Sequence, residues 1–413
     1  MTAQDPAEFT VQLLSPAYGG ESLGRLPDGR AVFVPFTLPG ETAHVRLVEE
    51  HRRHARAALL QIITPAPQRI QPRCKHFTIC GGCHYQNISY EDQLALKSMI
   101  LREQLQRIGG IERAPVKPAV PSPRPFNYRN HVQFHLTADN KLGYYQADGA
   151  AVFAIDECHL PEEPIERLWP QLDFDGMPEI DRIGLRTGSG EEFQLILESS
   201  QLTTPEITVE GLPLSVVHLS PAGPLVLVGS GSLVMHVLER QFVVSAGSFF
   251  QVNTPVAEAM LQYLLAGLPL TPNVVLLEVY CGVGLFSAFL APRVNRLVGI
   301  EASEAACDDF TVNLDQFENV ELYMGAAGQI LPFLQMQPDI ILVDPPRSGI
   351  ERADLQALLA MQAPFLAYIS CDPATLARDA RRLVEGGYSL TQITPFDLFP
   401  QTYHIESISF WER

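Results

Sequence analysis

A cysteine and a glutamate in the C-terminal third have the chemical character of a nucleophile and a base. Cys371 directly follows the apolar run 365–370, which predicts a buried strand, and a residue at that position faces the ligand crevice of an open α/β sheet. Glu406 lies between Ile405 and Ile408, which indicate a half-buried strand. A thiolate can add to an electrophilic carbon and a carboxylate can remove a proton. A structural thiol and an exposed charge are the alternatives.

A second group of residues predicts a ligand site at the ends of neighbouring strands. Gly282 and Gly284 follow the predicted strand 274–279, where glycine lets the backbone approach a ligand. Glu301 ends the next predicted strand, about twenty residues on, where an acid can accept both hydroxyls of a ribose. With Asp344 at a later strand end, the pattern favours S-adenosylmethionine over NAD. An ordinary turn and a solvated carboxylate are the alternatives.

The cysteine content points to metal chemistry. Seven cysteines in a chain of 413 residues do not suggest a disulfide framework, since the chain is expected to be cytoplasmic. Cys74, Cys80 and Cys83 lie within ten residues of one another, which predicts a metal or cluster site.

Three predicted parts must position these residues. Residues 1–68 contain five or so short strands between Gly-rich turns, which predicts a small OB-like β-barrel. Residues 69–250 combine a helix at 90–108 with strands over 126–245, which predicts a β-rich α+β domain. In residues 251–413 buried strands alternate with helices, which predicts a Rossmann-like α/β domain whose parallel sheet is covered on both faces.

Composition limits the function classes. The hydrophobic fraction of 46% and the charged fraction of 18% indicate a globular protein. The formal net charge of −18 argues against non-specific coating of nucleic acid, although it allows a local basic patch such as residues 51–56. The start is polar and acidic, and prolines interrupt the two longest uncharged runs, at 211–238 and 259–277. We therefore expect a cytoplasmic protein without a membrane span.

Five motifs, in order, resemble those of the RNA 5-methyluridine methyltransferases. They are SFFQVN at 248–253, YCGVG at 280–284, DPPR at 344–347, SCDP at 370–373 and FPQTYHIE at 399–406. The resemblance covers most of the chain and implies an S-adenosylmethionine site formed by Gln251, Tyr280, Glu301 and Asp344. It also implies that Cys371 is the nucleophile and Glu406 the general base.

The chemistry of uracil explains this pair. C5 of uracil is too weak a nucleophile to take a methyl group unaided. A thiolate that adds to C6 makes C5 enolate-like, so that C5 can attack the sulfonium methyl group. The C5 proton must then leave to a base before the thiol is expelled.

The N-terminal parts resemble modules of the same family. The predicted barrel is similar to the TRAM module, an RNA-binding fold. Cys74-x5-Cys80-x2-Cys83, with Cys158 downstream, resembles the iron–sulfur site of the ribosomal-RNA branch, which implies a [4Fe-4S] cluster held by these four thiolates. A structural zinc site with four cysteine ligands is the alternative. The spacing differs from the C-x3-C-x2-C pattern of radical enzymes, so the cluster would be structural.

The resemblance favours RNA as the partner and 23S ribosomal RNA as the substrate, with a monomeric enzyme. Transfer RNA, a non-catalytic RNA-binding or chaperone role, and C5-cytosine methylation are the alternatives. DNA cytosine enzymes carry a Pro-Cys pair, whereas Ser370 precedes the cysteine here. Leu285 and the segment 325–327 depart from the family pattern, which leaves the adenine contacts open.

Overall fold

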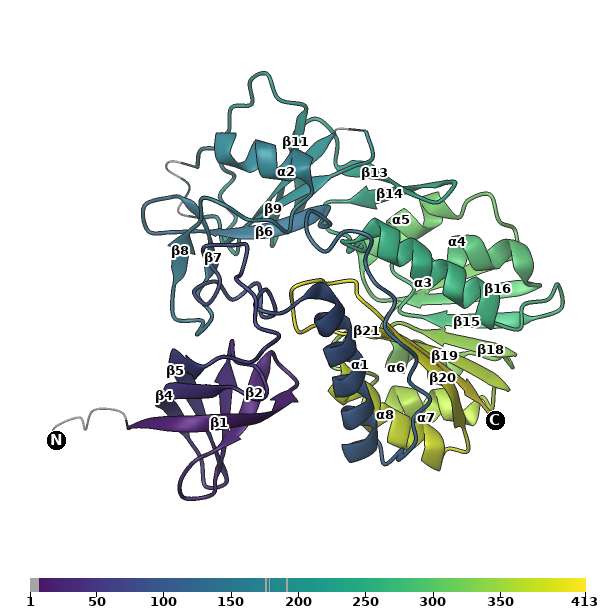
Figure 1. Cartoon of the computed structure of the whole chain (residues 1–413). Helices are drawn as coiled ribbons and strands as arrows, with labels where there is room; N and C mark the ends of the chain where they lie inside the picture. Colours follow the sequence, from purple (N-terminus) through teal and green to yellow (C-terminus); the bar gives the residue numbers. More distant parts are fainter. Residues whose placement is uncertain (1–6, 175–176, 178, 191) are drawn as a thin grey trace.

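The computed structural model describes residues 7–174, 177, 179–190 and 192–413. Figure 1 shows a barrel, a central β-rich part and an α/β part following one another along the chain. The first six residues of the predicted barrel domain, 1–6, lie outside the described residues. Among the described residues, no helix has the length and apolar character needed to cross a bilayer.

The first five strands close into a barrel, as the sequence predicted. They are β1 (Glu8–Ala17), β2 (Glu21–Arg25), β3 (Ala31–Pro35), β4 (Thr42–Glu50) and β5 (His54–Thr64), joined in the order β1-β2-β3-β5-β4. Buried and exposed positions alternate along β2, β3 and most of β4, because successive side chains of a strand point to opposite faces. Val32, Val34 and Val45 fill the interior.

The central part is a seven-stranded sheet in the order β12-β11-β10-β9-β6-β7-β8. Its strands are β6 (His131–Leu136), β7 (Leu142–Tyr145), β8 (Val152–Ala154), β9 (Arg182–Thr187), β10 (Phe193–Glu198), β11 (Leu214–Ser220) and β12 (Gly223–Val228). The short helices α2 (Glu163–Leu168) and η1 (Trp169–Gln171) pack on one face. The hairpin β13 (Ser232–Val237) and β14 (Arg240–Ser245) instead buries Val237 and Phe242 in the core of the C-terminal part.

The C-terminal sheet has the order β17-β16-β15-β18-β19-β21-β20. Its strands are β15 (Val275–Val279), β16 (Arg296–Glu301), β17 (Val320–Met324), β18 (Ile340–Val343), β19 (Phe365–Ser370), β20 (Ser389–Phe396) and β21 (Glu406–Glu412). One face packs against α3 (Thr254–Gly267), α4 (Ser287–Leu290) and α5 (Glu304–Asn313). The other packs against α1 (Tyr90–Arg107), α6 (Ala327–Ile330), α7 (Arg352–Ala360) and α8 (Pro373–Glu385). Two 3-10 turns, η2 (Ala291–Arg293) and η3 (Leu331–Phe333), complete the layers.

One strand departs from the predicted all-parallel sheet. β21 runs antiparallel to both β19 and β20, whereas the other neighbouring pairs are parallel. The reason is the short connection 397–405 between β20 and β21, since a short link joins antiparallel strands and a parallel pair needs a longer crossover. The start of β21 therefore lies at the edge where the parallel strands end.

Helix α1 belongs to the C-terminal core although it precedes the central sheet in the sequence. Ser89 caps the start of this helix, because its hydroxyl accepts the Asp92 N–H. Its buried Ile100, Leu101 and Leu105 share an apolar core with α8, and Figure 1 shows the two helices side by side. The helix thus fixes the N-terminal half of the chain against the α/β domain.

Candidate active site

Cys371 directly follows β19, and Glu406 begins β21, the antiparallel neighbour of β19. The last ladder pair between β19 and β21 joins Ser370 to Ser407, so the next step of the same register brings Cys371 level with Glu406. The thiol is partly accessible, whereas only 4% of the Glu406 surface is exposed. The predicted nucleophile and base therefore share one place at the carboxyl edge of the sheet.

Burial disfavours the charged forms of both Cys371 and Glu406. Burial, followed by the carboxyl groups of Glu406 and Asp344, raises the pKa of the Cys371 thiol to about 12. Burial, followed by Asp344, also raises the pKa of Glu406 well above its ordinary value. Arg347 opposes both shifts because its positive charge favours the anions. A further positive charge placed here would favour ionisation of both groups.

Three acids lie together at the ends of the neighbouring strands β15, β16 and β18. Burial, followed by Glu301, raises the pKa of Asp344 to about 7. Burial also raises the pKa of Glu278 to about 8, and the Ser287 hydroxyl opposes this by donating to its carboxylate at 2.5 Å. Such a cluster of carboxyl groups in a shielded crevice favours a ligand that carries positive charge.

The turn after β15 is shaped for close approach of a ligand. Tyr280 has a φ of +66°, a conformation that costs a non-glycine residue free energy and that is common at functional sites. Its N–H donates to Ile300 at 2.8 Å, and its hydroxyl donates to Asp354 at 3.3 Å. Gly282 donates its N–H to Glu301 at 2.9 Å, so the turn and the predicted ribose acid are directly joined.

The segment that contains Gln251 is anchored by the central sheet. Asn130 donates to the Gln251 carbonyl at 3.0 Å, and the buried guanidinium of Arg186 donates to the Ser248 carbonyl at 2.8 Å. Gln251 itself is buried just before α3. The central part therefore positions one strand-to-helix segment of the α/β crevice.

Two sequence matches and a matching fold identify the relatives of this chain. Residues 232–413 match the tRNA (uracil-5-)-methyltransferase family, and residues 7–60 match the TRAM domain. An uncharacterized RNA methyltransferase of Gloeobacter violaceus is 32% identical, covering 98% of this chain and 96% of that protein. One of Aquifex aeolicus is also 32% identical, covering 98% of both chains. The chain belongs to the RNA uracil-5-methyltransferase family.

A solved structure shares the whole fold of this family member. The crystal structure of the Pyrococcus abyssi tRNA (uracil-54, C5)-methyltransferase in complex with S-adenosyl-L-homocysteine matches with a TM-score of 0.72, at 22% identity, over 98% of this chain and 100% of that one. Family membership confirms the predicted enzyme class, an S-adenosylmethionine-dependent RNA methyltransferase with a TRAM domain. It favours an enzyme over the non-catalytic alternative.

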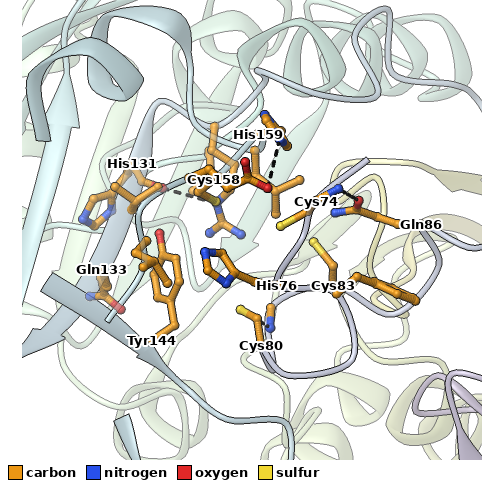
Figure 2. Close-up of a pocket in the computed structure, with 18 of the residues that line it drawn as sticks. Cys74, His76, Cys80, Cys83, Gln86, His131, Gln133, Tyr144, Cys158 and His159 are labelled. Atoms are coloured by element: carbon orange, nitrogen blue, oxygen red, sulfur yellow. Dashed lines mark hydrogen bonds and ion pairs between the residues drawn. The ribbon is translucent and has the colours of Figure 1, made fainter. Parts of the chain in front are cut away.

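In this uracil-5-methyltransferase, the four predicted cysteine ligands line one cavity. Cys74, Cys80, Cys83 and Cys158 border a cavity of about 370 Å³ between the loop 74–86 and the central sheet. Figure 2 shows their side chains directed toward that space. The Gly82 N–H donates to the Cys80 sulfur at 3.3 Å. Within the described residues, no group of three or more His, Cys, Asp or Glu side chains is arranged to hold a single metal ion.

The cysteine loop is attached to the loop that leads to Glu406. Directly after Cys83, the N–H groups of His84 and Tyr85 both donate to the Gln401 carbonyl, at 2.8 and 3.0 Å. Gln93 of α1 forms two further hydrogen bonds with Gln401, at 2.9 and 3.0 Å. Gln401 has a φ of +68°, and these contacts hold it in that conformation. The 399–405 loop is thus clamped from two sides.

Sequence reasoning missed two polar side chains near Cys371 and Glu406. Arg347 stands in the DPPR motif, and its guanidinium lies 3.4 Å from His404, in the loop before Glu406. A positive charge four residues after the end of β18, within the DPPR motif, was the signal that could have found it. Tyr18 of the barrel donates to Asp372, next to Cys371, and no local pattern relates positions 354 residues apart.

Proposed function

We propose that this methyltransferase transfers a methyl group to C5 of a uridine in 23S ribosomal RNA through a covalent bond between Cys371 and C6. The observation that carries the proposal is the Ser370–Ser407 ladder pair, which places the next residues, Cys371 and Glu406, at the same carboxyl edge of the sheet. A thiol nucleophile and a buried carboxyl group, side by side, meet the two needs of uracil C5 chemistry.

The steps assign one task to each side chain. Cys371 loses its proton to solvent, the resulting thiolate bonds to C6, and the electron pair of the C5–C6 double bond moves toward O4, which makes C5 nucleophilic. S-adenosylmethionine supplies the methyl group to C5 and leaves as the neutral thioether. The ionised Glu406 carboxylate then takes the C5 proton, the electron pair of that C–H bond re-forms the C5–C6 double bond, and Cys371 leaves C6 as the thiolate. Arg347 favours both anions, since it lowers the pKa of Cys371 and of Glu406.

The methyl donor would occupy the crevice at the ends of β15, β16 and β18. Glu301 would accept the ribose hydroxyls, Tyr280 and Gln251 would line the site, and Asp344 would face the sulfonium side. The acid cluster supports this arrangement because a sulfonium ion is positively charged. The same positive charge would lower the pKa of the Cys371 thiol when the donor binds, which links methyl-donor binding to activation of the nucleophile.

The cysteine cavity would hold a [4Fe-4S] cluster through Cys74, Cys80, Cys83 and Cys158. The donor set fits, since four thiols border one cavity and a backbone N–H donates to one of the sulfurs. A zinc ion needs its four ligands within about 2.3 Å of one point, whereas in a cluster each thiolate binds its own iron and the sulfurs stay apart. The four thiols around one cavity match the four-thiolate donor set of a [4Fe-4S] cluster, whose task would be structural.

Ribosomal RNA is favoured over transfer RNA because the cysteine set resembles that of the ribosomal-RNA branch. The deciding experiment uses protein purified without oxygen and methyl-labelled S-adenosylmethionine. Unmodified ribosomal and transfer RNA are offered in parallel, and the product nucleosides are analysed by mass spectrometry. Label in 5-methyluridine of 23S RNA supports the proposal, label in transfer RNA moves the substrate to the other branch, and label in 5-methylcytidine overturns the reaction.

A further inference from the structure

One tyrosine of the barrel contacts the loops of both proposed catalytic residues. Tyr18 lies in the turn between β1 and β2, and its hydroxyl donates to Oδ2 of Asp372 at 2.7 Å. The edge of its ring meets the ring of Tyr403, with centroids 5.7 Å apart. Asp372 directly follows Cys371, and Tyr403 lies three residues before Glu406.

Asp372 uses its two carboxylate oxygens for different purposes. Oδ1 accepts the N–H groups of Ala374 and Thr375, at 2.9 and 2.8 Å, and so caps the start of α8. Oδ2 is the atom that accepts from Tyr18. The hydroxyl can serve as a steady donor, since burial and then the bond to Asp372 raise the pKa of Tyr18.

The turn between β1 and β2 packs closely against His84 and the loop before Glu406. Gly20 lies so near His84 that a Cβ atom there would stand 2.8 Å from the His84 Cβ. The ring of His84 in turn meets Tyr403, with centroids 4.6 Å apart. The contact is therefore a shaped interface between the barrel and the α/β domain, and Tyr18 is the member that reaches the nucleophile loop.

We propose that Tyr18 is a positioning residue for methyl transfer, because it ties the Cys371 loop to the Glu406 loop and makes the barrel part of the active site. This inference rests on the proposed roles of Cys371 and Glu406. It gives the barrel a task beyond holding RNA: the docked barrel helps to hold the two loops that follow and precede the proposed catalytic pair.

The hydroxyl also acts on the charge around the nucleophile. The charged and titratable groups near Cys371 include Glu406, Asp344, Arg347, Asp372, Tyr18 and Tyr368. A donor on Asp372 offsets part of the negative charge next to the thiol. Without that donor, the thiolate is less favourable, and its formation moves to higher pH.

The test removes only the hydroxyl, with Tyr18→Phe. Tyr388→Phe is the matched control, because it deletes a tyrosine hydroxyl that donates to the Ala363 carbonyl at 2.7 Å, away from both loops. We expect the single-turnover methylation rate of Tyr18→Phe at saturating RNA to fall about tenfold, as for loss of a hydrogen bond to a charged group. The KM for RNA should stay within about twofold of wild type. The control should keep its rate.

The pH profile separates positioning from mere folding. Peptide mass spectrometry measures the rate at which Cys371 is alkylated at each pH. The pH midpoint of this rate should be higher in Tyr18→Phe than in wild type. In an Asp372→Asn background, which keeps a helix cap, Tyr18→Phe should cause no further shift. A normal single-turnover rate with a raised KM for RNA would overturn the proposal, since Tyr18 would then serve RNA binding alone. An unchanged alkylation profile would overturn it as well.

Failure of the proposed function has a different signature. If Cys371→Ala keeps full activity, the nucleophile assignment fails, whatever Tyr18→Phe does. If Cys371→Ala is inactive and Tyr18→Phe matches wild type in rate and profile, only the role of Tyr18 fails.

Discussion

Lys97 and Asp397 form a fully buried ion pair, with 2.6 Å between Nζ and Oδ1, that joins α1 to the start of the loop before Glu406. Lys97 also donates to the Phe399 carbonyl at 3.0 Å. Burial lowers the pKa of Lys97 and Asp397 opposes that shift, so each charge depends on the other. The loop 397–405 before Glu406 is therefore bound to a helix some 300 residues earlier in the chain.

Removing one partner of this pair should destabilise the protein. In Lys97→Met the Asp397 carboxylate stays buried without its cation, which costs about 3–5 kcal/mol in comparable pairs. Urea unfolding measures the change. Lys141→Met is the control, because Lys141 pairs with Asp139 at 3.2 Å on the surface and its loss should matter little. An equal loss of unfolding free energy in both variants would show that the buried pair stabilises the protein no more than the surface pair does.

Cys371→Ala should abolish methyl transfer and leave binding of S-adenosylmethionine within about twofold of wild type, because the thiol reacts with RNA and not with the methyl donor. Calorimetry gives the binding constant and labelled methyl transfer gives the rate. Cys307→Ala, which removes a buried thiol of α5, is the matched variant and should retain transfer. Measurable turnover by Cys371→Ala would contradict the covalent route.

Glu406→Gln should trap a covalent complex of protein and methylated RNA. The glutamine cannot take the C5 proton, so the C6–S bond has no route to break. A denaturing gel detects the adduct, and nuclease digestion followed by mass spectrometry locates it on Cys371. Glu412→Gln, at the exposed far end of the same strand, should turn over normally. Release of methylated RNA by Glu406→Gln at the wild-type rate would remove Glu406 from the mechanism.

Charge on the bound methyl donor should set the reactivity of the thiol. In the free protein the pKa of Cys371 is raised to about 12, so its alkylation rate should rise toward alkaline pH. S-adenosylmethionine carries a sulfonium charge and should move this rise to lower pH, whereas S-adenosylhomocysteine is a neutral thioether and should not. Peptide mass spectrometry of alkylated Cys371, with each compound, measures the midpoint. The same midpoint with both compounds would rule out this link.

Loss of the proposed cluster should loosen the loop 399–405 before Glu406. Cys83→Ser is expected to lose iron and sulfide, and with them the constraint on His84 and Tyr85, whose N–H groups hold Gln401. Hydrogen exchange in residues 399–405 should then accelerate. Cys307→Ser should keep both the iron content and the slow exchange. Full iron content in Cys83→Ser would exclude Cys83 as a ligand, and unchanged exchange after iron loss would separate the cluster from the loop.

The amino-acid sequence by itself determined the types of element and the chemistry at their ends. Apolar runs that end in Asp344 or Cys371 identify buried strands whose last residues face a crevice, because this signal is local and repeats along the chain. The barrel was equally readable, since short strands between Gly-rich turns leave few other folds. Ordered motifs then related these positions to one family.

Only the tertiary structure decided which of these residues meet. The direction of β21 brings Glu406 level with Cys371, and strand direction depends on a hydrogen-bond register that no single window of sequence contains. Tyr18 contacts Asp372, which lies 354 positions later in the sequence. Helix α1 packs on α8, although all strands of the central sheet lie between these helices in the sequence. Such contacts arise when separate apolar faces are buried together, a property of the folded chain as a whole.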